Sequence, residues 1–193
     1  QIKAAERLER QAWLRNGQTE LAEQVLGRLT LNMLGRNILQ FCAQYLGSVV
    51  AAVYVREDHG GLRRIASYGF SREQEARNEV IHNDEGIVGQ SAQQDKLIRL
   101  DDVPSDYCIK VSSGLGEGSP RSVLVVPTSD DDDRVNGVLE LGFLRPLEDR
   151  DVELLELIAS NIGTSIEAAR YRQRLQEVLA ETQQLNEELQ VQQ

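Results

Sequence analysis

The C-terminal segment constrains the fold of this chain more than any other part of the sequence. From Glu148 to the last residue there is no proline and one glycine, Gly163, which predicts a single helix of roughly 45 residues. At about 1.5 Å per residue this helix is about 65 Å long. A globular body of about 140 residues measures only about 35–40 Å across. Part of the helix therefore projects beyond the body, and a projecting helix needs a partner.

Two apolar stripes run along this predicted helix. The first stops near Arg170 and is expected to pack on the body; it comprises Leu155, Ile158, Ile162, Ile166 and Ala169. The second alternates steps of three and four, the spacing of a coiled-coil seam. Its members are Leu154, Leu157, Asn161, Thr164, Ala168, Tyr171, Leu175, Val178, Thr182, Leu185 and Leu189. We expect this seam to form a parallel homodimer; the alternative is a solvated tail with occasional leucines.

The N-terminal segment is also expected to be helical. Apolar residues recur there at helical spacing, namely Leu21, Val25, Leu29, Leu34, Ile38, Phe41, Cys42 and Tyr45. We interpret Asn16-Gly17 as a break between a polar first helix and a buried second helix, and Gly47 as the end of the second. The chain is accordingly divided into a linker helix over 1–27, a globular domain over 28–170 and a coiled-coil helix over 171–193.

The middle of the chain has the short apolar runs and turn residues of an antiparallel sheet. Strands are predicted at 48–55, 62–68, 97–100, 122–127 and 135–144, with turns at 58–61 and 130–134, a short helix at 86–92 and a polar, glycine-rich loop at 105–120. The predicted fold class is α+β, with a central antiparallel sheet and the N- and C-terminal helices packed together on one face.

Charge and composition narrow the classes of function. The net charge is −10 at pH 7, which argues against nucleic-acid binding, because that relies on clustered lysine and arginine. No apolar run approaches the ~20 residues that span a bilayer, and no signal-peptide pattern opens the chain. The two cysteines form neither a disulfide framework nor a zinc site. A cytoplasmic, reducing environment is therefore expected.

Five segments of the chain resemble a GAF domain. They are Gly86-Ile87-Val88-Gly89-Gln90, Ile98-Arg99-Leu100-Asp101-Asp102-Val103-Pro104, Ser122-Val123-Leu124-Val125-Val126-Pro127, Gly137-Val138-Leu139-Glu140-Leu141 and the helix from Asp151 to Ala169. They stand in the family's order, and the resemblance covers roughly residues 28–170. It implies a GAF/PAS-like sheet around a cavity for a small ligand.

The loop from Asp106 to Arg121 and the two flanking helices look like those of multidomain, hybrid sensor histidine kinases of the two-component type. In such proteins a linker helix precedes the GAF domain, often after a membrane-proximal module, and a coiled coil leads to the kinase. The resemblance implies a non-catalytic sensory module in a phosphorelay, with a histidine kinase domain C-terminal to it in the same chain. The alternatives are a structural dimerisation connector without a ligand, and a GAF-type photoreceptor or reductase.

Glu140 is the most informative polar residue of the predicted sheet. Strand alternation places Leu139, Leu141 and Phe143 towards the terminal helices and Glu140 towards the cavity. A buried, unpaired carboxylate is costly, so Glu140 is expected to pair with a base such as Arg121 or Arg99 or to contact a ligand; the remaining alternative is exposure to solvent. Tyr107, on the loop, is expected either to stack on or hydrogen-bond a bound molecule or to be a surface tyrosine.

The glycine-rich loop supplies the other candidate ligand contacts. Successive backbone N–H groups around Gly114 and Gly116, near Lys110 and Arg121, form a possible anion cradle; the alternative is a flexible lid that binds nothing. The complete candidate ligand-binding set is Tyr107, Cys108, Gly114, Gly116, Arg121 and Glu140. No catalytic or metal-binding residues are expected, and Asp130 to Asp133 is interpreted as a solvated turn.

The identity of the ligand is left open by the sequence. Relatives that attach a bilin use a cysteine near the position of Cys108, usually followed by histidine, whereas Ile109 follows here. The Asn-Lys-Phe-Asp type motif of cyclic-nucleotide-binding relatives is missing, and haem is not expected either. Sulfoxide reductases of this fold use several cysteines, but Cys42 is expected in the core. His59 and His82 are expected at the surface.

Overall fold

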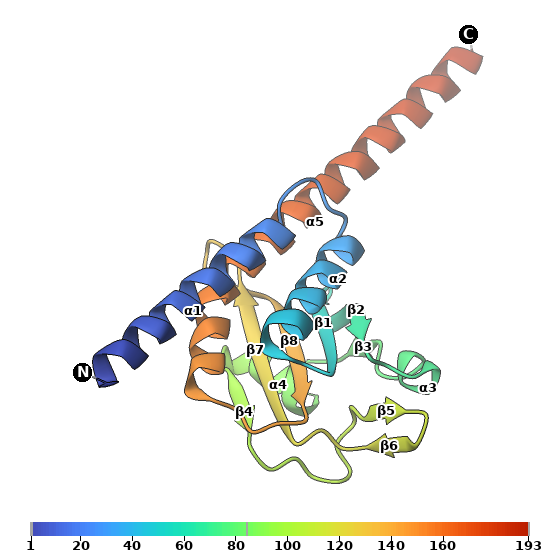
Figure 1. Cartoon of the computed structure of the whole chain (residues 1–193). Helices are drawn as coiled ribbons and strands as arrows, with labels where there is room; N and C mark the ends of the chain where they lie inside the picture. Colours follow the sequence, from blue (N-terminus) through green and yellow to red (C-terminus); the bar gives the residue numbers. More distant parts are fainter. Residues whose placement is uncertain (1, 84, 193) are drawn as a thin grey trace.

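The computed structural model describes residues 2–83 and 85–192 and has three helices on one face of a twisted antiparallel sheet (Figure 1). The sheet is six-stranded, in the order β3-β2-β1-β8-β7-β4. The predicted α+β class, with the terminal helices together on one face, is confirmed. The strands are β1 (Val50–Arg56), β2 (Leu62–Tyr68), β3 (Val80–Ile81), β4 (Ile98–Leu100), β7 (Ser122–Ser129) and β8 (Val135–Phe143).

The helices fall into two groups on opposite faces of the sheet. The first contains α1 (Ile2–Gln24), α2 (Leu31–Phe41) with its π-helical continuation η1 (Cys42–Leu46), and α5 (Asp149–Gln192). The second contains α3 (Arg72–Glu75) and α4 (Gly86–Gln94). The predicted loop over 105–120 also carries a small hairpin, β5 (Val111–Ser113) and β6 (Gly116–Gly118). Gly47 ends η1 with a positive φ of 76°, as predicted.

The expected break at Asn16-Gly17 is wrong, because α1 continues through these residues to Gln24. Gly17 does not form a turn; it allows α1 to pack closely against its neighbouring helices. A Cβ atom at this position would lie 2.8 Å from the ring of Tyr45 and 2.9 Å from Leu154. The absence of a side chain therefore lets α1 lie directly against α2 and α5, and the chain reverses after Gln24.

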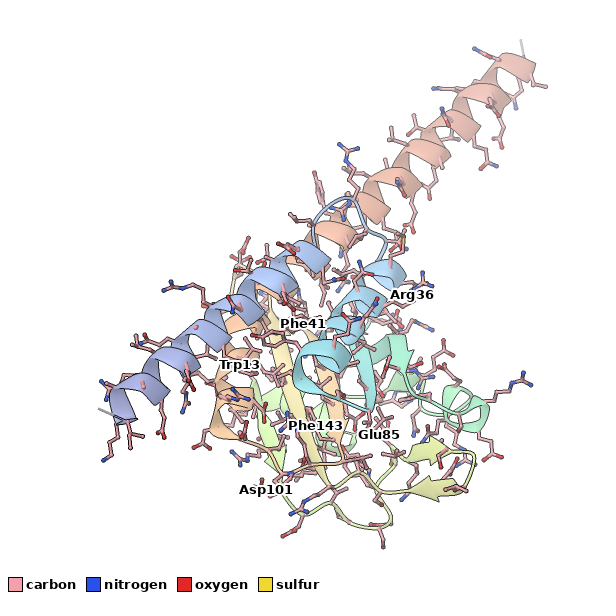
Figure 2. All side chains as sticks on the ribbon, in the orientation of Figure 1. Trp13, Arg36, Phe41, Glu85, Asp101 and Phe143 are labelled. Carbon is pink, nitrogen blue, oxygen red and sulfur yellow. The ribbon has the colours of Figure 1, made fainter. Side chains whose placement is uncertain are left out.

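Two hydrophobic cores lie on the two faces of the sheet. Leu139, Leu141 and Phe143 of β8 are buried in the core beneath the helices, whereas Val138 lies in the core on the opposite face. The predicted alternation of β8 is therefore confirmed. Trp13 on α1, Phe41 on α2 and Phe143 on β8 mark the helix-side layer (Figure 2).

The first apolar stripe of α5 packs on the sheet as predicted, since all five of its residues are buried. The contact is closest at Gly163, where a Cβ atom would lie 1.8 Å from the carbonyl oxygen of Ser129 on β7. The side-chain amide of Asn136 on β8 donates to the carbonyl oxygen of Gly163 at 2.8 Å. The middle of α5 is thus fixed directly to β7 and β8.

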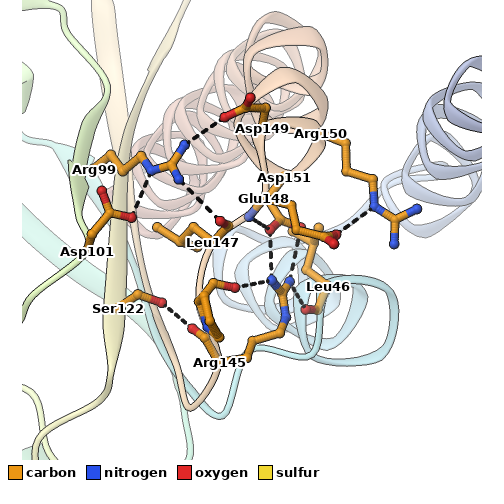
Figure 3. Close-up of polar contacts among 11 residues, drawn as sticks. Leu46, Arg99, Asp101, Ser122, Arg145, Leu147, Glu148, Asp149, Arg150 and Asp151 are labelled. Carbon is orange, nitrogen blue, oxygen red and sulfur yellow. Dashed lines mark hydrogen bonds and ion pairs between the residues drawn. The ribbon is translucent and has the colours of Figure 1, made fainter. Parts of the chain in front are cut away.

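A polar network fixes the start of α5 (Figure 3). Arg145 donates to both carboxylate oxygens of Asp151, at 2.8 and 3.0 Å, and to the carbonyl oxygen of Leu46 at 2.7 Å. Asp151 is 1% exposed. Arg99 on β4 donates to Asp149 at 3.1 Å. The network joins the N-terminal end of α5 to η1 and to the edge strand β4.

The C-terminal part of α5 projects away from the body (Figure 1), and every described residue from 173 onward is exposed. Leu154 was expected to lie in the dimer seam, and this prediction is wrong. Leu154 is fully buried within the protomer, because it packs under Gly17 of α1. The other seam residues are exposed, and the coiled coil stays a prediction.

Among the described helices, none has both the length and the apolarity needed to cross a membrane.

Candidate functional site

A cavity of about 600 Å³ lies on the face of the sheet opposite the terminal helices. Glu140 lies at its floor, so we call it the Glu140 cavity. The strands β1, β2 and β8 supply the floor, and α3, α4 and the segment 104–110 supply the walls. Its apolar lining comprises Phe70, Val80, Ile81, Ile87, Val88 and Ile109. This size and lining are typical of small-molecule sites.

Glu140 is 6% exposed, and its partner comes from the loop. The hydroxyl of Tyr107 donates to Oε2 of Glu140 at 2.6 Å. A short turn positions this tyrosine, since its backbone N–H donates to the carbonyl oxygen of Pro104 at 3.1 Å. The expected pairing of Glu140 with Arg99 or Arg121 is wrong, because Arg99 is engaged with Asp101 and Asp149 and Arg121 is exposed.

Burial governs the electrostatics of the cavity floor. It raises the pKa of Glu140 from 4.5 to about 7, while the hydrogen bond from Tyr107, the nearby hydroxyl of Tyr54 and the charge of Arg64 lower it. Burial and the charge of Glu140 also raise the pKa of Tyr54 and of Tyr107 above the ordinary value of 10. Both tyrosines therefore remain hydrogen-bond donors at neutral pH.

Arg64 enters the cavity because of an irregularity in β2. Tyr54 pairs with Arg64 while the preceding Val53 pairs with Ala66, so one residue of β2 is bulged out. The side chain of Arg64 is 5% exposed. Its guanidinium donates to the carbonyl oxygens of Arg77 at 2.9 Å and Glu75 at 2.7 Å.

The mouth of the cavity is formed by the segment around Cys108, which is exposed. The ammonium group of Lys110 donates to the carbonyl oxygen of Ser105 and, at 3.1 Å, to the hydroxyl of Ser119. The side chain of Gln74 on α3 donates to the carbonyl oxygen of Lys110 at 2.9 Å. These hydrogen bonds connect two parts of the 105–120 loop to each other and connect the loop to α3.

The structure brings together three of the six candidate ligand-binding residues. Tyr107, Cys108 and Glu140 line the Glu140 cavity. Gly114 and Gly116 instead lie on the exposed β5–β6 hairpin, and nothing lies within 4 Å of a Cβ atom built on either. Because Lys110 is engaged by Ser105 and Ser119 and these glycines lie away from the cavity, the expected anion cradle is not assembled.

Sequence reasoning missed Tyr54, Arg64 and Phe70. Tyr54 had a detectable signal, because it is the one buried residue of β1 whose side chain has a polar group. Arg64 had none, since the bulge that turns it inward is not marked by a glycine or proline. Phe70 follows the strand and stacks beneath the guanidinium of Arg64, 5.0 Å from its ring centre.

The remaining candidate residues lie away from the Glu140 cavity or on the other face of the sheet. Cys42 is buried in the helix-side core, where burial raises the pKa of its thiol to about 12. The sheet therefore separates it from Cys108. His59 and His82 are exposed, as predicted. Asp130 closes the β7–β8 turn by accepting hydrogen bonds from the backbone N–H groups of Asp132 and Arg134.

Comparison with known proteins agrees with this architecture. The family model of the GAF domain matches residues 29–167. The chain matches none of the curated proteins by sequence. It is similar to the GAF domain of a phosphoenolpyruvate-protein phosphotransferase from Coxiella burnetii, with a TM-score of 0.69 and 18% identity, over 83% of this chain and 96% of that one.

Two further solved structures show the same fold. One is free methionine-R-sulfoxide reductase from Neisseria meningitidis in complex with its substrate, with a TM-score of 0.64 and 20% identity over 82% of this chain and 91% of that one. The other is a putative GAF sensor protein from Burkholderia vietnamiensis, with a TM-score of 0.65 and 17% identity over 84% and 94%.

Proposed function

Because this chain belongs to the GAF family, we propose that it is a sensory module that binds a small molecule in the Glu140 cavity and relays occupancy through α5. The observation that carries the proposal is the contact between Tyr107 and Glu140. It joins the mouth segment of a roomy cavity to a buried carboxylate on the central strand β8. A ligand that binds Glu140 would therefore lie next to Tyr107.

The route from the cavity to α5 runs through β8. Glu140 lies on its cavity side, while the neighbouring Leu139 and Leu141 are packed in the same core as Ile158 and Ile162 of α5. Packed interiors transmit small displacements because they have few voids. A shift of β8 on ligand binding is therefore expected to move α5 with it.

The projecting part of α5 supports a homodimer as the form that signals. A solvent-exposed helix of this length is marginal in water unless an apolar stripe is covered. Leu175, Val178, Leu185 and Leu189 are exposed at seam spacing, and a parallel coiled coil through them would cover them. We further propose a C-terminal histidine kinase domain as the recipient of the signal, on the strength of the sequence resemblance alone.

A structural connector is the second candidate function. It is favoured by the Tyr107–Glu140 hydrogen bond, because that bond partly satisfies the buried carboxylate without a ligand. In this reading the cavity has no occupant, and α1 and α5 serve only to dimerise the chain. Catalysis of the sulfoxide-reductase type is not favoured, because Cys42 and Cys108 lie on opposite faces of the sheet.

A thermal-shift screen separates the sensor from the connector. A library of metabolites is tested against the wild-type chain and an Ile87→Trp variant, in which the half-buried Ile87 on the cavity wall is replaced by a larger side chain that obstructs the cavity. The sensor proposal predicts compounds that raise the Tm of the wild type and leave that of the variant unchanged. If no compound distinguishes the two proteins, the connector is the better account.

A further inference from the structure

We propose that the ligand of the Glu140 cavity is a compact organic cation with N–H donors, such as a protonated primary amine or an amidinium, attached to an apolar body. This inference rests on the proposed ligand-binding function and specifies the chemical class of the ligand. It follows from the acceptors at the cavity floor, from the basic side chains of its walls and from the charges at its rim.

The floor offers hydrogen-bond acceptors that the protein uses only in part. A carboxylate accepts about four hydrogen bonds, and among the described residues the hydroxyl of Tyr107 supplies one of them. The exposed remainder of Glu140 faces the cavity. A buried carboxylate forms charge-assisted hydrogen bonds with any donor, and a cationic N–H donor adds the attraction between opposite charges, which is stronger in a poorly hydrated site than in water. The floor therefore selects for a cationic nitrogen.

The basic side chains that line the cavity are largely engaged within its walls. Arg64 donates to two backbone carbonyls and lies over Phe70. Lys110 is held by Ser105 and Ser119. An anionic ligand would have to displace these contacts and then approach the carboxylate of Glu140. The cavity is consequently a poor site for an anion.

The rim of the cavity is acidic. Among the cavity-lining residues that the structure describes, four have exposed carboxylates, namely Glu73, Glu85, Asp106 and Glu117, and one base, Arg77, is exposed. The chain as a whole carries a net charge of −10. Such a field raises the local concentration of cations at a cleft, so the rim and the floor favour the same sign of charge.

The walls define the rest of the ligand. Phe70, Ile81, Ile87 and Ile109 present apolar surface around the acidic floor, and this surface suits an aromatic or aliphatic body next to the nitrogen. A small hydrophilic cation such as ammonium itself would leave these walls uncovered. The proposal is therefore an amphipathic cation whose nitrogen lies at Glu140.

Cation binding is expected to depend on pH, because it requires the ionised form of Glu140. The groups that face this carboxylate are Tyr54 on β1, Arg64 on β2, and Tyr107 and Cys108 on the mouth segment, while α4 contributes the apolar Val88. The pKa values of both tyrosines are raised above 10 and that of Glu140 to about 7. Affinity should thus fall below pH 7 by up to about tenfold per pH unit.

Three probes with the same aromatic ring test the inference: benzylammonium, benzyl alcohol and phenylacetate. Their binding to the chain is measured by ligand-observed NMR at pH 7.5 and 5.5. We expect benzylammonium to bind at least about tenfold more tightly than the other two at the higher pH, a difference of about 1.4 kcal/mol. Its affinity should drop by about tenfold or more at the lower pH.

Two variants test whether the preference for benzylammonium depends on Glu140 at the cavity floor. Glu140→Gln keeps an acceptor for Tyr107 and should reduce the affinity for benzylammonium by at least about tenfold, with a smaller loss for benzyl alcohol, whose O–H donor is neutral. Glu156→Gln, at an exposed position on α5, is the matched control and should leave all three affinities unchanged. A thermal melt of each variant verifies that it is folded.

The outcomes separate this inference from the proposed function. If phenylacetate or benzyl alcohol binds as tightly as benzylammonium or more tightly, the inference that the ligand is a cation is wrong, whereas the proposed ligand-binding function is unaffected. Unchanged benzylammonium binding in Glu140→Gln also overturns it. Absence of benzylammonium binding at about 10 mM, a generous limit for a ligand of this size, overturns it too, and the metabolite screen then decides separately whether the cavity binds any ligand.

Discussion

At the scale of single residues, Glu140 imposes a free-energy cost that an apolar residue at this position would avoid. Burial raises its pKa to about 7, which means that the native state ionises this carboxyl less readily than the unfolded chain does. The native state therefore binds more protons than the unfolded state between about pH 4.5 and 7. The free energy of unfolding accordingly falls as the pH rises through that window.

Glu140→Gln should remove this pH dependence. We expect the variant and the wild type to be similarly stable near pH 4.5, because both then carry a neutral side chain. Above pH 7 the variant should be more stable by up to about 3 kcal/mol. Urea unfolding followed by circular dichroism from pH 4.5 to 8 measures the difference, with Glu156→Gln as the control. Parallel pH profiles for wild type and Glu140→Gln would contradict the burial of the carboxylate.

The sequence predicts the location of Glu140 but not its partner. Alternation along a strand is a local property, so the face on which Glu140 lies could be read from its neighbours. Its partner Tyr107 belongs to a loop whose path depends on contacts such as Gln74 with Lys110, and these lie outside any periodic pattern. Arg64 was missed for a related reason, since a bulge reverses the alternation of β2.

At the scale of elements, the contact between α5 and β7 depends on a missing side chain. Gly163→Ala should favour the helix by about 1 kcal/mol from intrinsic propensity. The added Cβ would meet the backbone of Ser129, and we expect this overpacking to reverse the sign and destabilise the chain by about 1–3 kcal/mol. Thermal unfolding measures the effect. The control is Ser160→Ala, at an exposed position of the same helix, which should change the free energy of unfolding by less than about 0.5 kcal/mol. If Gly163→Ala were as stable as the wild type, the close contact between α5 and β7 would be refuted.

The N-terminal end of α5 provides a second test at this scale. Asp151→Asn breaks the bidentate ion pair with Arg145 at a position that is 1% exposed. We expect a loss of about 2–4 kcal/mol in the free energy of unfolding. In Asp149→Asn, the carboxylate removed is 82% exposed and pairs with Arg99, so the loss should stay below about 1 kcal/mol. Similar losses in both variants would show that burial does not set the strength of this network.

The elements themselves were largely predictable, and the differences have packing causes. The long helix, the hairpins and the strands follow from uninterrupted or alternating apolar patterns. Gly17 was misread because a glycine that permits close helix packing has the same sequence signature as one that ends a helix. Leu154 was placed in the dimer seam because its spacing fits, whereas α1 covers it within the protomer.

At the scale of the whole molecule, the projecting part of α5 is the proposed dimer contact. Replacing Leu185 and Leu189 with aspartate places like charges on the proposed seam, and we expect the dimer to dissociate at micromolar concentration. Sedimentation velocity measures the change. The pair Gln183→Asp and Gln190→Asp adds the same charge outside the seam and should remain dimeric. If the leucine variant sediments like the wild type, the dimer contact lies elsewhere.

Native mass spectrometry of the purified chain tests the central claim, a dimeric sensor with an occupied cavity, most directly. The account predicts twice the chain mass of 21.6 kDa plus a small adduct that disappears on denaturation and is lost in the Ile87→Trp variant. A monomer without an adduct at micromolar concentration would contradict it.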